Sequence, residues 1–372
     1  MTLTPKVSGG QVIATLIICR LFILMIFVPT THRTVSTNAA FLVIITGALL
    51  TLAASIPAVL LLKNHKECSL LDCAGNIAPR LRWPFAFLFF LVCLAVATES
   101  AGQFEYFITT AVYPQAKGRM VILLFCLVAW YMVFLGIEAI SRASGVILTL
   151  VCVTFGVICF NSLGQIDTLN LISPFYDGWE EILYGSVLYF AQNIELVLWL
   201  LLLPYAKGHW LGKSFLWYNG VIVLILEIVS FFTLTVMGTY GQTRIFPVYT
   251  LSAVSDTRFF YRLDYFYILI WTFVALFRTA IYVYFLAKLL HIILPQKVGD
   301  KLGKKAMDGL AVAAVACCTF FTAKETGSFE AVYRVIASGL PVFLLIMVAP
   351  TVLLGLEYHE KRKEAQGNEG EN

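Results

Sequence analysis

Long apolar segments constrain the fold of this sequence more than any other feature. A transmembrane helix needs about 20 predominantly apolar residues, and the chain contains ten runs of roughly that length. They are too long and too apolar for barrel strands, so we expect helices with internally satisfied backbones. The predicted spans are 11–30, 39–62, 84–110, 119–139, 143–163, 182–204, 214–239, 262–290, 306–323 and 331–355.

The composition excludes soluble enzymes, nucleic-acid binders and secreted domains. Of the 372 residues, 60% are hydrophobic and only 13% are charged, whereas soluble domains carry about 25% charged residues. We therefore predict an all-α integral membrane protein with one ten-helix transmembrane domain over residues 1–356. The segment 357–372 is charged and rich in Gly and Asn, and we expect a disordered cytoplasmic tail.

The distribution of Lys and Arg predicts the orientation. With the N-terminus in the cytoplasm, the inner segments carry about twice as many Lys and Arg residues as the outer ones. The even number of spans then places both termini in the cytoplasm.

No arrangement of residues indicates catalysis or metal binding. The five histidines lie at span ends or in loops, and the nine cysteines show no disulfide or metal spacing. Zinc-protease, nucleophile-elbow and phosphate-loop motifs are missing from the sequence. We expect no enzymatic activity, no metal and no cofactor.

Charged residues within the spans are the candidate functional residues, because ionisable groups at membrane depth are costly and face the protein interior or a wet cavity. Arg20 lies in the middle of the first span. It needs an anionic partner, and either a ligand carboxylate or an internal salt bridge would serve. In the third span, Glu99 and Gln103 are four residues apart and share a helix face. Glu99 would hold an ammonium group, transfer a proton or pair with Arg20.

The sixth span holds the densest polar cluster, Gln192, Asn193 and Glu195. A polar interruption halfway through a span is typical of a discontinuous helix, which exposes backbone groups to a substrate. A network of hydrogen bonds between helices is the alternative interpretation.

The eighth span carries Arg278, Thr279 and Tyr282. We expect Arg278 near the inner third of the span, where its side chain extends towards the interface, with Glu227 as a candidate partner. The hydroxyl groups of Thr279 and Tyr282 are candidates to face a cavity.

Two further sets of charges are interpreted as structural. Glu138 and Arg142 are spaced as an i, i+4 ion pair. Arg262 and Asp264 stand at the outer start of the eighth span.

Short motifs follow one another along nearly the whole chain: K-V-S-G-G-Q at 6–11, G-I-E-A-I-S-R at 136–142, Q-N-I-E at 192–195, F-P at 246–247, F-Y-R-L-D at 260–264 and I-W at 270–271. As an ordered set they resemble the endospore germination permeases, the B subunits of germinant receptors, within the amino acid–polyamine–organocation superfamily. The sequence departs from that pattern in having Asn193 in place of a Gly, and Arg20 in a first span without a central Gly.

The resemblance implies a five-plus-five inverted-repeat architecture, similar to LeuT-like transporters. It implies a nutrient, such as an amino acid, bound in a pocket lined by spans 1, 3, 6 and 8. It also implies an A subunit in the membrane and a lipoprotein C subunit as partners, in the inner membrane of the spore. The candidate ligand contacts on these spans are Arg20, Glu99, Gln103, Gln192, Asn193, Glu195, Thr279 and Tyr282.

Two alternatives remain open. One is a proton- or sodium-coupled amino acid transporter, for which Glu99 and Glu195 would serve as the relay. The other is a structural scaffold with a vestigial pocket. The identity of the nutrient and the unwinding of the first span are not determined by the sequence.

Overall fold

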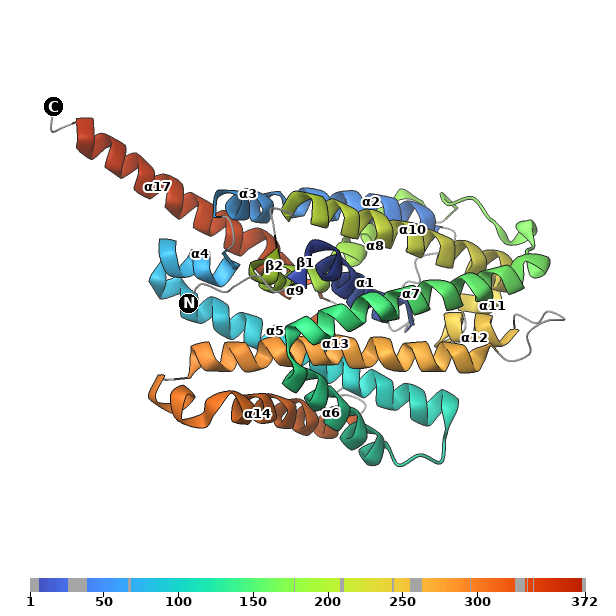
Figure 1. Cartoon of the computed structure of the whole chain (residues 1–372). Coiled ribbons are helices and arrows are strands. Elements are labelled where there is room, and N and C mark those ends of the chain that lie inside the picture. The colour runs from blue at the N-terminus through green and yellow to red at the C-terminus, as the bar shows by residue number, and fades with distance from the viewer. Residues whose placement is uncertain are drawn as a thin grey trace.

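The structure is a computed structural model that describes residues 7–25, 39–65, 68–176, 178–207, 211–242, 244–254, 263–294, 296–324, 332, 334–336 and 338–369. Helices account for nearly all of these residues (Figure 1). The elements of the first half are β1 (Val7–Ser8), α1 (Gly9–Met25), α2 (Ala40–Ala54), α3 (Ile56–Asn64), α4 (Leu70–Ile77), α5 (Pro79–Phe107), the π-helix η2 (Ile108–Val112), α6 (Gly118–Leu135), α7 (Ile137–Ser162), and the 3₁₀ turns η3 (Leu163–Gln165) and η4 (Thr168–Asn170).

The second half begins with the two parts of the sixth span. Its elements are α8 (Trp179–Ala191), α9 (Glu195–Leu202), the 3₁₀ turn η5 (Leu203–Tyr205), β2 (Ala206–Lys207), α10 (Leu211–Met237), α11 (Thr239–Gln242), α12 (Pro247–Val254), α13 (Asp264–Ile293), α14 (Gln296–Lys324), α16 (Leu340–Val342), the π-helix η6 (Phe343–Val348) and α17 (Ala349–Glu369). Helix α14 is kinked at Gly303, where φ is 67°.

The described residues contain nine helices that are long and apolar enough to cross a membrane. Residues Gly9–Phe22 of α1 form a further, shorter apolar helix. The prediction of an all-α integral membrane protein is therefore confirmed, and these helices are consistent with ten spans. Of the predicted first span, 11–30, residues 26–30 lie outside the described part of the chain.

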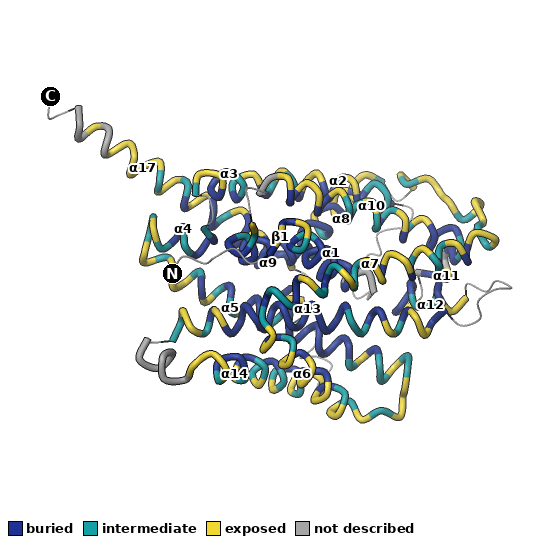
Figure 2. The backbone as a smooth tube through the Cα atoms, viewed as in Figure 1, coloured by how far each residue is buried: buried dark blue, intermediate teal, exposed yellow. Residues whose placement is uncertain are grey.

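Burial separates central helices from peripheral ones (Figure 2). In the most apolar part of the segment Trp179–Tyr205, 78% of residues are buried, and in α13 the share is 72%. In α6 it is only 28%, with large apolar side chains exposed. Because lipid tails solvate apolar side chains, a membrane protein keeps such residues on its outer surface, and its polar residues gather inside.

The long helices have their ends at two opposite sides of the bundle. Figure 1 shows α4, the adjoining ends of α13 and α14 and the far end of α17 at one side, with α11 and α12 at the other. The first of these sides is the one for which the sequence predicts an excess of Lys and Arg.

A short sheet joins the start of the first span to the end of the sixth. Strands β1 and β2 pair in parallel, with Val7 opposite Ala206 and Ser8 opposite Lys207. The start of α1 is thereby fixed to the end of the α9–η5 segment, although about 200 residues separate them in the chain.

A glycine allows the sharp reversal between α6 and α7. Gly136 ends α6 and precedes α7, with φ at 89°. A side chain is strained in that region of backbone conformation. This requirement explains the Gly that begins the G-I-E-A-I-S-R motif.

The last span and the tail differ from the sequence-based expectation. The described helix of the last span begins at Leu340, directly after Gly339, whose φ is 70°. At the other end, α17 continues to Glu369, through most of the segment that we expected to be disordered. Glu and Lys are good helix formers, and Lys361 Nζ donates to Glu357 Oε1 at 2.6 Å in an i, i+4 pair.

Candidate functional site

The sixth span is discontinuous at the position predicted from its polar residues. Helix α8 ends at Ala191 and α9 begins at Glu195, with the turn Gln192–Ile194 between them. The N–H of Asn193 donates to Phe190 O at 3.0 Å rather than to Tyr189 O. A helix end leaves carbonyl groups without partners inside the helix, and here that end lies in the middle of a buried span.

Arg20 of α1 binds the carbonyl groups at this helix end. Its Nη1 donates to Gln192 O, and its Nη2 donates to Tyr189 O at 3.4 Å. The guanidinium group also lies over the Tyr189 ring, 5.2 Å from its centroid. Only 3% of Arg20 is exposed. Helix α1 itself is continuous from Gly9 to Met25, so the described part of the first span is not unwound at Arg20.

Glu195 lies between two arginines. It is the first residue of α9, and its side chain is fully buried. Its Oε2 lies 3.7 Å from Arg20 Nη1, and its Oε1 lies 3.4 Å from Arg278 Nε. A carboxylate at the start of a helix is stabilised by the positive end of the helix dipole.

Arg278 of α13 completes the network. Its Nη1 lies 2.7 Å from Glu99 Oε2 in α5 and donates to Ser100 Oγ at 2.9 Å. The other oxygen of Glu99 accepts a hydrogen bond from Gln103 Nε2. We call Arg20, Glu99, Glu195 and Arg278 the central charge network. It holds two positive and two negative charges, and this balance lowers the cost of burying each of them.

The position of Arg278 corrects the sequence-based expectation. The side chain is 1% exposed and pairs with Glu99 and Glu195, so it does not extend to the interface or pair with Glu227. The number of residues between Arg278 and the end of its span gives only an approximate depth in the membrane. It does not identify the helices that the side chain contacts.

The other candidate residues are placed around this network or near it. Asn193 Oδ1 accepts a hydrogen bond from Tyr218 of α10 at 2.7 Å. Gln192 contributes its backbone carbonyl group to Arg20. Thr279 and Tyr282 are buried in α13, and their hydroxyl groups have no hydrogen-bond partner among the described residues.

The predicted ion pair of Glu138 and Arg142 lies away from the network. Arg142 Nη2 contacts Glu138 Oε1 within α7, with the Arg142 side chain exposed and that of Glu138 partly exposed. Arg262 lies outside the described residues, so its relation to Asp264, the buried first residue of α13, is not described.

Two contact residues were not identified from the sequence. Tyr218 is one of many aromatic residues in a long apolar helix, and nothing in its spacing distinguishes it. Ser100 directly follows Glu99, and a polar neighbour of a buried carboxylate is a weak signal by itself.

An aromatic cluster adjoins the network through Phe22, whose ring centroid lies 4.6 Å from Arg278 Cζ. Trp271 is fully buried and packs against three phenylalanines, with ring centroids 5.8 Å from Phe22, 5.4 Å from Phe104 and 4.4 Å from Phe107. Phe107 also meets Phe246 edge to face at 5.0 Å. The F-P and I-W motifs therefore contribute to one aromatic cluster, towards the end of the bundle that holds α12 (Figure 1).

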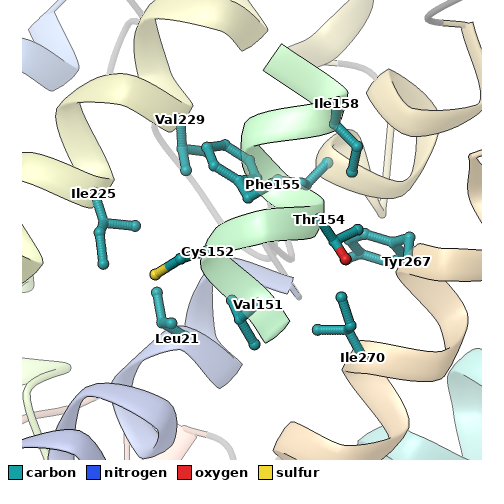
Figure 3. A pocket seen from close by; sticks show the side chains of 11 residues that line it. Leu21, Val151, Cys152, Thr154, Phe155, Ile158, Ile225, Val229, Tyr267 and Ile270 are labelled. Atoms are coloured by element: carbon teal, nitrogen blue, oxygen red, sulfur yellow. The ribbon is translucent and has the colours of Figure 1, made fainter. Parts of the chain in front are cut away.

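An apolar cavity of about 70 Å³ lies next to this region, and its wall includes Leu21, the neighbour of Arg20 (Figure 3). Its polar lining residues are Thr154 and Tyr267, apart from the thiol of Cys152. Since it offers no charged group, the cavity does not suit a zwitterion or an ion. The remaining lining residues are Val151, Phe155, Ile158, Ile225, Val229, Val248 and Ile270.

Cys73, in the short helix α4 outside the predicted spans, is an inert thiol. Burial raises its pKa to about 12, with the neighbouring Cys68 and Asp72 acting in the same direction. A protonated thiol is a poor nucleophile and a poor metal ligand.

Two membrane transporters are among the solved structures that align with the chain. A Na⁺-coupled sialic acid symporter, in a substrate-bound outward-open state, aligns with a TM-score of 0.64 and 14% identity over 93% of this chain and 79% of its own. A manganese transporter from Eremococcus coleocola, in complex with an aromatic bis-isothiourea substituted compound, aligns with a TM-score of 0.42 and 14% identity, over 91% of this chain and 76% of its own. The first likeness shows the fold, which is the expected LeuT-like architecture with five-plus-five inverted repeats.

The sequence comparison identifies the family. No curated protein matches the chain. Residues 6–326, however, match the family described as spore germination protein. This family is of permease type and is not a family of enzymes. Because the match covers most of the sequence, the chain belongs to the spore germination protein family of permease-like membrane proteins.

Proposed function

We propose that this chain is the nutrient-sensing subunit of a spore germinant receptor and that it binds a small nutrient, an amino acid by preference, at the central charge network. The observation that carries the proposal is the break between α8 and α9, where Arg20 and Glu195 lie at the two half-helix ends. Half-helix ends near the membrane midplane are the usual substrate and ion sites of transporters with this kind of repeat.

The charges of the network match those of a zwitterion. Arg20 offers donors to a carboxylate, and Glu195 and Glu99 offer acceptors to an ammonium group. The contact between Arg20 and Glu195, at 3.7 Å, is too long for a hydrogen bond. Replacing this contact by contacts to a ligand therefore costs less free energy than replacing a hydrogen bond of the network. Asn193 Nδ2 and Tyr282 OH have no hydrogen-bond partner among the described residues and provide further ligand contacts.

A ligand at this position acts on several helices at once. Arg20, Glu99, Glu195 and Arg278 come from α1, α5, α9 and α13. A nutrient that separates Arg20 from Glu195 favours one arrangement of these helices over another, and its differential affinity drives the change. We propose that the A subunit and the lipoprotein C subunit receive this change in the inner membrane of the spore, with both termini of the chain in the cytoplasm.

Dipicolinate release from spores tests the proposal. Spores without the chain are compared with spores carrying the wild type, Glu195→Gln or Glu138→Gln, across amino acids, sugars and nucleosides. We expect the response to one nutrient to disappear with the chain. For Glu195→Gln, we expect the half-maximal concentration to rise about tenfold, the equivalent of about 1.4 kcal/mol. Glu138→Gln, at a partly exposed position away from the network, retains the wild-type response.

Two results would count against the proposal. If every nutrient response survives deletion in spores without a related receptor, the chain is not the sensor. If Glu195→Gln leaves the dose–response curve unchanged, Glu195 is not part of the ligand site.

A coupled amino acid transporter is the second candidate, because the chain shares its fold with a Na⁺-coupled symporter. This function predicts saturable uptake by the purified chain in liposomes, driven by a proton or sodium gradient. The sensor predicts nutrient binding with little or no net flux.

A further inference from the structure

The C-terminal end of α8 presents backbone carbonyl groups to a single side chain. Tyr189 O has lost its expected donor, because the N–H of Asn193 binds Phe190 O. Both Tyr189 O and Gln192 O instead accept hydrogen bonds from Arg20. The same guanidinium faces the carboxylate of Glu195 at 3.7 Å. Arg20 is thus surrounded by two carbonyl oxygens and a carboxylate, a set of ligands that suits a small cation.

Electrostatics favours a cation at this position. The C-terminal end of a helix carries about half a negative charge, and here it lies within a largely buried span. In broken-helix transporters, unwound carbonyl groups and half-helix C-terminal ends coordinate Na⁺ or a proton. A guanidinium group stays protonated in proteins and carries the same unit charge.

We propose that Arg20 is the built-in cation of this helix break, so that the folded chain takes no inorganic cation there. Replacing Arg20 by a small neutral residue then creates a binding site for a free monovalent cation. The charge balance supports this. Without Arg20, the central charge network has one positive charge, on Arg278, and two negative charges, on Glu99 and Glu195. The excess negative charge lies beside the carbonyl groups of α8.

The test is thermal unfolding of the purified full-length chain in detergent, without nutrient, so its outcome does not depend on the proposed sensing function. Wild type, Arg20→Ala and Arg20→Gln are compared in choline, sodium and low-millimolar guanidinium chloride at constant ionic strength. We expect the wild type to melt at the same temperature in all three salts. Arg20→Ala melts at a lower temperature in choline, and guanidinium restores at least half of the loss.

Arg20→Gln serves as the milder variant if Arg20→Ala does not fold. Its shorter side chain keeps one amide donor group and removes the charge, so we expect sodium to raise its melting temperature above the value in choline. Arg142→Ala is the control, since it removes an exposed arginine from a pair away from the break, and guanidinium should not change its melting temperature.

The proposal is overturned by either of two results. A wild-type chain that melts at a lower temperature in choline than in sodium would need an inorganic cation that Arg20 does not supply. Variants of Arg20 that melt alike in all three salts would show that no cation site replaces the side chain.

Discussion

Arg278 and Glu99 form a buried ion pair between α13 and α5, with Nη1 of the arginine 2.7 Å from Oε2 of the glutamate. Each partner has a further contact. Arg278 Nη1 donates to Ser100 Oγ, and the second oxygen of Glu99 accepts from Gln103. Since α5 and α13 pack extensively against each other, this pair connects two of the most buried helices of the bundle.

The losses of stability on breaking this pair from its two sides should not be additive. We expect Glu99→Gln and Arg278→Gln each to lower the free energy of unfolding by about 3–5 kcal/mol, because each leaves a buried charge without its main partner. The double variant should lose less than the sum, by at least about 1 kcal/mol. Denaturant unfolding in micelles measures this double-mutant cycle. Additive losses would mean that the two groups do not interact.

Gly47 of α2 is expected to tolerate no side chain. A Cβ atom there would lie 2.7 Å from Cβ of Tyr189, and Tyr189 O is one of the acceptors of Arg20. We expect Gly47→Ala to destabilise the chain by about 1–3 kcal/mol, as overpacking does. Gly145→Ala in α7, with no atom within 4 Å of its Cβ, is the matched control and should be neutral or stabilising. Equal effects of the two substitutions would show that the α2–α8 contact is not tight.

Tyr218 should stabilise the folded chain through its hydrogen bond to Asn193 Oδ1. In Tyr218→Phe, Asn193 Oδ1 loses its donor inside the protein, and an unsatisfied buried acceptor costs about 1–3 kcal/mol. Thermal unfolding should detect the loss, and the nutrient dose–response should shift because Asn193 lies in the break. Tyr131→Phe, at an exposed position, provides the comparison and should leave both unchanged. A stable Tyr218→Phe chain with an unchanged response would contradict the role given to Asn193.

The ion pair between Glu138 and Arg142 should contribute little to stability, although both residues belong to the G-I-E-A-I-S-R motif at 136–142. The Arg142 side chain is exposed and that of Glu138 is partly exposed, and surface pairs contribute about 0–1 kcal/mol. We expect Arg142→Ala to stay within about 1 kcal/mol of the wild type in denaturant unfolding. A larger loss would indicate a partner that covers this end of α7.

Much of the helix arrangement can be predicted from the sequence, because the membrane imposes a length and an apolar composition on each span. The break in the sixth span is also predictable, since Gln192, Asn193 and Glu195 interrupt an apolar run. The shared face of Glu99 and Gln103 follows from helix geometry, and their side chains do meet.

The pairing of charges between helices is not predictable in this way. Periodicity gives the face of a helix on which a residue lies, but it does not identify the helix that this face contacts. Glu99 was a candidate partner of Arg20, whereas the structure pairs it with Arg278. Arg278 was expected near the interface because its distance from Asp264 along the helix was the only available measure of its depth.

The most direct measurement is nutrient-dependent thermal unfolding of the purified chain, comparing the wild type with Glu195→Gln and Glu138→Gln. We expect at least one nutrient to raise the melting temperature of the wild type and of Glu138→Gln, and this increase to be lost or strongly reduced in Glu195→Gln. An equal increase in all three chains would place the nutrient elsewhere and contradict a binding site at the helix break.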